Sequence, residues 1–158
     1  MAARLPKHDR RWQGAALTAA AVAVRDLEGG SVRYLTSRDG FDDWASALQW
    51  HPDGSALFFQ ADVKGRTPIL EIELAGGGIR EVRRDGAISG WRVGPKGESI
   101  VYTRSKVGAP PEVFRVPIAG GEALRITDFN AALEAEVDIR PAEELWVDGD
   151  GDSKVQVF

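Results

Sequence analysis

ALQWHPDG, residues 47–54, begins a unit of roughly forty residues that occurs twice in the chain. In the first copy it is followed by the apolar run LFF at 57–59 and the alternating run ILEIEL at 69–74. A glycine turn at 76–78 comes next. Repetition at this length is typical of a structural module that is itself repeated.

The second copy keeps the same order and nearly the same spacing. It reads WRVGPKG at 91–97, IVY at 100–102 and VFRVPI at 113–118. Pro52 and Pro95 are 43 residues apart, while Gly77 and Gly121 are 44 apart. The register therefore holds to within one residue across the whole unit.

Each copy predicts four antiparallel strands. In ILEIEL, Leu70 and Ile72 face one side while Glu71 and Glu73 face the other, which is the pattern of a half-buried strand. LFF is apolar at every position, as expected of a central strand covered on both faces. The Pro and Gly residues between the runs favour tight hairpins. The sequence thus predicts an all-β fold, a partial β-propeller with two full four-stranded antiparallel blades at about 46–85 and 88–129.

Incomplete copies are expected on both sides of the full ones. A partial blade is predicted from residue 21, with Leu27 at the position that Leu74 occupies in the next copy. After residue 130, short strands are expected at 137–139, 144–147 and 155–158. Residues 1–20 show no clear period and are expected to be irregular.

The composition of the 158 residues excludes several function classes. A formal net charge of −4 and a pI near 5.2 give no basic field for nucleic acid or an anionic membrane. Cysteine is absent, which excludes disulfides and thiolate chemistry. The uncharged run 14–24 is about half the length that spans a bilayer. We therefore predict neither a nucleic-acid partner nor a membrane partner.

The compartment is left open by the sequence. A basic start with Arg4 and Lys7, followed by the apolar run 15–24, resembles a signal peptide. Asp9 and Trp12 argue against that interpretation, and the run passes into an expected strand. We favour an N-terminal strand, or a start inside a longer gene, and the cytoplasm over the periplasm.

One acidic cluster has the spacing of a calcium loop. Asp148, Asp150 and Asp152 alternate as the first ligands of such a loop do. Ser153 occupies the position that requires glycine, and no carboxylate follows at the twelfth position. An exposed hairpin turn is the favoured interpretation, and calcium is the alternative.

Nothing in the sequence supplies a catalytic arrangement. The two histidines are His8, in the irregular start, and His51, in a Pro-Asp-Gly turn, where a solvated side chain is expected. There is no Gly-x-Ser-x-Gly nucleophile elbow. The acidic pairs 42–43 and 143–144 are sequence neighbours and are expected on the surface.

Three tryptophans, Trp44, Trp50 and Trp91, are expected to fill the core. We predict no catalytic, cofactor-binding or metal-binding residue and no cofactor.

Several segments together resemble the propeller of the prolyl oligopeptidase family of serine peptidases, in its acylaminoacyl-peptidase and dipeptidyl-peptidase branch. The Trp50-x-Pro52-Asp53-Gly54 turn is shared with TolB-like propellers, so it discriminates weakly. The other segments are Gly65-Arg66-Thr67-Pro68, Ser89-Gly90, Tyr102-Thr103-Arg104-Ser105, Pro110-Pro111-Glu112-Val113-Phe114, Asp128-Phe129-Asn130 and the tail 145–156. Among these, the Pro-Pro-Glu segment and the terminal stretch 150–156 are the more specific. The resemblance covers roughly residues 30–158.

The resemblance implies a propeller that caps an α/β-hydrolase domain and limits the access of peptides to it. The family's catalytic Ser, Asp and His have no counterpart in this chain, which is therefore expected to be inactive alone. The implied organisation is an irregular segment 1–20, a partial propeller 21–147 and, at 148–158, the start of a connection to a hydrolase domain.

We expect a fragment of a larger protein, whose partners are that hydrolase domain and, through the intact enzyme, peptide substrates. Two full blades cannot close a ring, and their open edges also predict self-association. A TolB-like propeller acting as a protein-interaction module is the alternative function.

Overall fold

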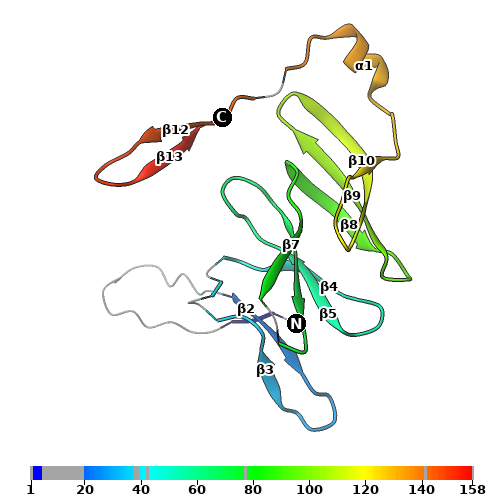
Figure 1. The fold of residues 1–158 in the computed structure, drawn as a ribbon, viewed down its shortest axis with the longest axis vertical. Coiled ribbons are helices and arrows are strands. Elements are labelled where there is room, and N and C mark those ends of the chain that lie inside the picture. Colours follow the sequence, from blue (N-terminus) through cyan, green and yellow to red (C-terminus); the bar gives the residue numbers. More distant parts are fainter. Residues whose placement is uncertain are drawn as a thin grey trace.

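The computed structural model describes residues 2–4, 20–37, 40–41, 43–76, 78–140 and 142–157. Antiparallel sheets succeed one another along the chain, followed by a short helix and a hairpin that projects from the sheets (Figure 1). The first sheet has three strands: β1 (Ala2–Arg4), β2 (Ala20–Arg25) and β3 (Val32–Tyr34).

Two four-stranded sheets form the body of the molecule. The second sheet contains β4 (Ser46–Trp50), β5 (Ala56–Gln60), β6 (Ile69–Glu73) and β7 (Ile79–Arg83). The third contains β8 (Ala87–Val93), β9 (Ser99–Lys106), β10 (Ala109–Pro117) and β11 (Leu124–Arg125). In both sheets the strands pair antiparallel and in sequence order. The two predicted four-stranded blades are confirmed, and the all-β fold with them.

The second sheet is covered on both faces. On one face Leu57 and Phe59 pack with Val22 of the first sheet. On the other face Phe58 joins Trp91 and Tyr102 of the third sheet in a cluster that we call the inter-blade core. Its buried members are Phe58, Ile69, Val82, Ile88, Trp91, Ile100, Tyr102, Phe114, Val116 and Ile118. This double burial explains why the LFF run is apolar at every position, as predicted.

The same double burial corrects the expectation for β6. Glu71, predicted to face solvent, is buried, because its face of the sheet packs toward the third sheet. Arg80 on β7 neutralises it, with Nε donating to Glu71 Oε2 at 2.7 Å. Arg80 Nη2 also donates to the carbonyl of Ile118 in the third sheet at 3.0 Å. A paired and hydrogen-bonded carboxylate tolerates a site that an isolated one could not.

Glutamine side chains of the second sheet hydrogen-bond to the backbone of the third. Gln49 donates to the carbonyl of Trp91 at 2.8 Å and accepts from the N–H of Val93 at 3.2 Å. Gln60 donates to the carbonyl of Ile88 at 2.8 Å. These bonds join β4 and β5 of the second sheet to β8 of the third and fix the relative placement of the two blades.

The first sheet forms the predicted partial blade, with one difference. Leu27 and Leu74 each begin the turn that follows their strand, so the predicted equivalence of position is confirmed. Leu27 is 94% exposed, whereas Leu74 is partly buried against the second sheet. Of the segment 1–20, the structure describes Ala2–Arg4, which pair with β2, and Ala20. His8, Asp42 and Pro141 lie outside the described residues.

The chain leaves the third sheet through α1 (Ala131–Glu136). The strand expected at 137–139 is absent from that described stretch, because the N–H of Val137 closes the helix by donating to the carbonyl of Leu133 at 3.1 Å. The hairpin of β12 (Leu145–Asp148) and β13 (Lys154–Val157) follows, as predicted.

α1, with six residues, is too short to cross a bilayer, and none of the described residues belongs to a longer apolar helix.

Candidate functional site

The loops at one end of the two full blades lie together, and we call this end the loop rim. It consists of the β5–β6 loop 61–68, the β7–β8 loop 84–86, the β9–β10 loop 107–108 and the segment 126–130 after β11. The antiparallel order places these connections at one end of the sheets and the turns 51–55 and 94–98 at the other. Two segments that carried the family resemblance, 65–68 and 128–130, belong to the loop rim, and two more, 102–105 and 110–114, lie on the strands that flank its β9–β10 loop.

Asp85 in the β7–β8 loop gathers three cations around one carboxylate. Arg83 Nη2 lies 2.7 Å from its Oδ2 and Arg104 Nη1 lies 2.9 Å from the same oxygen, while Lys106 pairs with Oδ1. Burial alone would raise the pKa of Asp85, but hydrogen bonds from Lys106, Arg83 and Arg104 outweigh it and hold that pKa well below its usual value. The guanidinium of Arg104 also stacks on the Phe114 ring, with Cζ 3.8 Å from the ring centroid.

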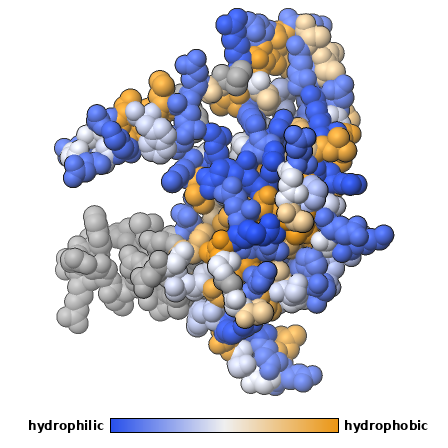
Figure 2. Space-filling view, viewed as in Figure 1, coloured by the Kyte–Doolittle hydropathy of each residue, from blue (hydrophilic) through white to orange (hydrophobic). Residues whose placement is uncertain are grey.

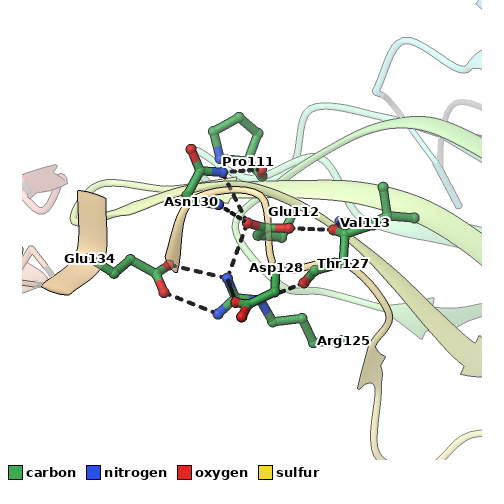
Figure 3. A network of polar contacts seen from close by, with 8 residues as sticks. All are labelled: Pro111, Glu112, Val113, Arg125, Thr127, Asp128, Asn130 and Glu134. Atoms are coloured by element: carbon green, nitrogen blue, oxygen red, sulfur yellow. Dashed lines mark hydrogen bonds and ion pairs between the residues drawn. The ribbon is translucent and has the colours of Figure 1, made fainter. Parts of the chain in front are cut away.

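Glu112, in the Pro-Pro-Glu segment, is the hub of a second network (Figure 3). The side chain of Thr127 donates to its Oε2, and Asn130 donates to its Oε1 from the backbone at 2.8 Å and from Nδ2 at 3.0 Å. Arg125 Nη2 lies 3.1 Å from the same oxygen and also pairs with Glu134 of α1.

The Glu112 network has the character of a structural clamp. The residue is 3% exposed. Burial would raise its pKa, but the bonds from Thr127 and Asn130 outweigh it and lower the pKa from 4.5 to about 2. A carboxylate this well satisfied holds β10, the end of the third sheet and α1 together. It is a poor proton acceptor at neutral pH, so it does not supply general-base chemistry.

The loop rim also carries a hollow of about 540 Å³. Its wall includes Gly65, Arg66, Gly86 and Lys106 from the blades and Glu144 from the segment before β12. Arg66 Nη2 donates to Glu144 Oε2 at 2.8 Å, which ties this segment to the β5–β6 loop. The pKa of Glu144 is lowered, chiefly by Arg66. Hydrophilic residues gather over the middle of the molecule on the face shown in Figure 2.

The sequence did not single out Asp85, Arg83 or Lys106. The pairing of β8 with β9 and the short loop between β7 and β8 bring them together, because Arg104 and Lys106 follow Asp85 by 19 and 21 positions. The one sequence feature that could have indicated this cluster was the charged turn RRDG at 83–86, which has the composition of an ordinary loop.

His51 lies at the end of the blades opposite the loop rim. Its Nε2 lies 3.1 Å from the carbonyl oxygen of Gly97, in the equivalent turn of the next blade, and its Nδ1 lies 2.6 Å from Asp53 Oδ1. The ring also packs near Phe58, with centroids 6.0 Å apart. The expectation of a solvated histidine was wrong, because the repeat places one turn directly over the next.

The acidic residues singled out in the sequence are not brought together as a metal site. Asp148 pairs with Lys154 across the β12–β13 hairpin, as expected of an exposed turn. Within the described parts of the chain, no three acidic or histidine side chains are arranged to hold a metal ion. Glu143 is exposed, while its neighbour Glu144 bonds to Arg66.

Of the three tryptophans predicted to fill the core, one does. Trp91 is 1% exposed within the inter-blade core. Trp44 and Trp50 are half exposed, at 51% and 50%. Trp50 lies on β4 and Trp91 on β8, which are the first strands of the second and third sheets, so position in the repeat alone does not decide their burial.

Successive antiparallel blades packed face to face define part of a β-propeller. No protein-family model matches the chain. Dipeptidyl-peptidase 5 of Porphyromonas gingivalis is 25% identical over 124 residues, which are 78% of this chain and 18% of that protein. The chain thus spans less than a fifth of the length of this curated relative.

Solved structures show the same fold. The Pyrococcus horikoshii acylaminoacyl peptidase matches 87% of this chain and 20% of its own, at 15% identity and a TM-score of 0.65. TolB from Acinetobacter baumannii matches 72% of this chain and 28% of its own, at 21% identity and a TM-score of 0.55. Together the comparisons support the resemblance to the propeller region of the prolyl oligopeptidase family.

Proposed function

We propose that this chain is a non-catalytic propeller segment of a serine peptidase of the prolyl oligopeptidase family. In this proposal the segment docks on an α/β-hydrolase domain and gates the access of peptides to it. Residues 21–147 form the propeller part, and residues 148–158 begin the connection to the hydrolase domain. The open faces of the outer blades also offer a route to self-association.

The observation that carries the proposal is the return of the tail to the loop rim. Glu144, just before β12, bonds to Arg66 in the Gly-Arg-Thr loop at 2.8 Å. The next strand begins at Leu145, so whatever follows the propeller starts beside the rim loops. A domain attached there would lie over the loop rim and restrict the access of peptides to it.

The apolar side of the hairpin supports a docking role. Leu145, Val147, Val155 and Val157 share one face of β12–β13 and are each 41–55% exposed. An isolated two-stranded hairpin is marginally stable in water, so such a face is expected to pack against a further layer.

A TolB-like interaction module is the second candidate, favoured by the likeness to TolB structures. Those likenesses cover 71–72% of the chain, whereas the acylaminoacyl peptidase covers 87%. The larger coverage favours the peptidase architecture.

The coding sequence around this chain tests the proposal first. We expect a Gly-x-Ser-x-Gly elbow with later Asp and His after the propeller, and no turnover of acyl-peptide or prolyl chromogenic substrates by this chain alone. Additional Pro-Asp-Gly blades with a cleaved leader and no hydrolase would favour the TolB-like module instead.

Gating is tested in the intact enzyme by comparing long with short peptide substrates. Arg66→Ala removes the bond to Glu144 and is expected to raise the ratio of long-peptide to short-peptide hydrolysis, because the rim is held less tightly. Lys96→Ala, in the exposed turn at the opposite end of the blades, is the matched control. An unchanged ratio in Arg66→Ala would argue against gating by this contact.

A further inference from the structure

The Asp85 cluster holds more positive charge than its own carboxylate can balance. Arg83, Arg104 and Lys106 all pair with this one acid, which leaves two positive charges in excess among the four groups. The side chains of Asp85, Arg83 and Arg104 are only 6%, 26% and 23% exposed. Excess charge in so sheltered a place is poorly screened by water and favours the binding of an anion.

Buried hydrogen-bond donors in the Asp85 cluster also indicate that a further group could bind there. The Nε atoms of Arg83 and Arg104 are buried and have no hydrogen-bond partner within the described residues, whereas the hydroxyl of Tyr102 interacts with Arg83. Buried donors without partners are rare in folded proteins and commonly mark a place for water or a ligand. The cluster is therefore incomplete both in charge and in hydrogen bonding.

Lys106 connects this cluster with the hollow at the loop rim. Its ammonium pairs with Asp85, its side chain is 40% exposed, and it also forms part of the wall of the hollow. An ammonium has three donors, so the contact with Asp85 leaves others available to a ligand. Gly86 lines the hollow at φ +72°, where a Cβ would overlap the carbonyl of Ser105, so the loop can approach this closely only with glycine.

Beside Lys106 and the paired Arg66 and Glu144, part of the wall is small or apolar and suits a small organic body better than a bare ion. Gly65, Ala87, Val107 and Ala142 contribute small or apolar surface around the charged groups. A volume of about 540 Å³ lies within the range of small-molecule sites, about 300–1,000 Å³.

We propose that this hollow binds the carboxylate end of a short peptide, with Lys106 as the counter-charge and the small residues around the peptide body. The peptide part deepens the proposed function and rests on it. Binding to the lone chain does not depend on a hydrolase domain, so the two proposals fail separately.

The test is calorimetric titration of the full chain with N-acetyl-dialanine, its C-terminal amide and inorganic phosphate. We expect the acid to bind about tenfold more tightly than the amide, because the amide lacks the charge that Lys106 recognises. Lys106→Met should weaken binding of the acid by about tenfold. Lys154→Met is the matched control, since Lys154 pairs with Asp148 in the distant hairpin and should leave binding unchanged.

Three results would overturn the proposal. These are equal affinity for acid and amide, equal effects of the two Met variants, and binding of phosphate without binding of the acid. If Lys106→Met does not fold, the comparison of acid with amide on the unchanged chain still decides the matter.

Discussion

Replacing Phe58 by alanine should reveal how strongly the two full blades depend on each other. Phe58 is 0% exposed and lies on β5, yet its ring belongs to the inter-blade core with residues such as Trp91 and Phe114 of the third sheet. Its removal therefore leaves a cavity between two sheets, where neither sheet can collapse into the space without shifting against the other.

The expected cost follows from buried phenylalanines in general. Truncation to alanine removes about 3–5 kcal/mol of unfolding free energy, from a total of about 5–15 kcal/mol for a typical domain. For a chain of this length each kcal/mol shifts the melting temperature by about 2–4 °C, so a fall of about 6–20 °C is expected. Trp91 lies in the same core and reports the transition by its fluorescence.

The control is the same substitution at an exposed site. Phe129 is 80% exposed, and Phe129→Ala should change the unfolding free energy by no more than about 0.5 kcal/mol. A fall of less than about 2 °C in Phe58→Ala, or equal falls in both variants, would refute the reasoning that the blades share one core.

Two further variants test the turns and the Glu112 clamp. Gly97 and Gly54 both have positive φ, but a Cβ on Gly97 would overlap the His51 ring, whereas a Cβ on Gly54 would meet open space. Gly97→Ala should therefore lower the unfolding free energy in urea by about 1 kcal/mol more than Gly54→Ala does. Equal losses in the two variants would contradict the contact between Gly97 and His51. Glu112 has its folded pKa lowered to about 2, so its contribution is complete above pH 4.5 and is lost as the pH falls from 4.5 toward 2. Glu112→Gln should flatten the fall of melting temperature over that range, whereas Glu73→Gln, at an exposed position, should keep the wild-type slope.

The local sequence carries most of what is needed to predict the blades. The LFF run and the alternating ILEIEL run define strands, and the Pro and Gly residues between them define hairpins, because both signals act over a few neighbouring residues. The repeat strengthens the prediction of four strands per blade, since the same order of runs and turns recurs in the second copy. Burial is harder to predict, since Trp50 on β4 and Trp91 on β8 both lie on edge strands, yet Trp50 is 50% exposed and Trp91 only 1%.

The candidate site could be predicted only in part. Glu112 stood out through the family resemblance, but its role as a clamp became visible only from its contacts with Thr127, Asn130 and Arg125. Asp85 was not predicted at all.

The sequence alone determined that this protein is built from two consecutive four-stranded propeller blades, because strand period and turn chemistry are local properties that the repeat states twice. Tertiary structure alone decided which charges meet. Whether Glu71 is exposed or buried, and whether Asp85 faces one cation or three, depends on the face that each sheet turns to its neighbour. That packing places side chains tens of residues apart within hydrogen-bonding distance, and no local pattern in the sequence records it.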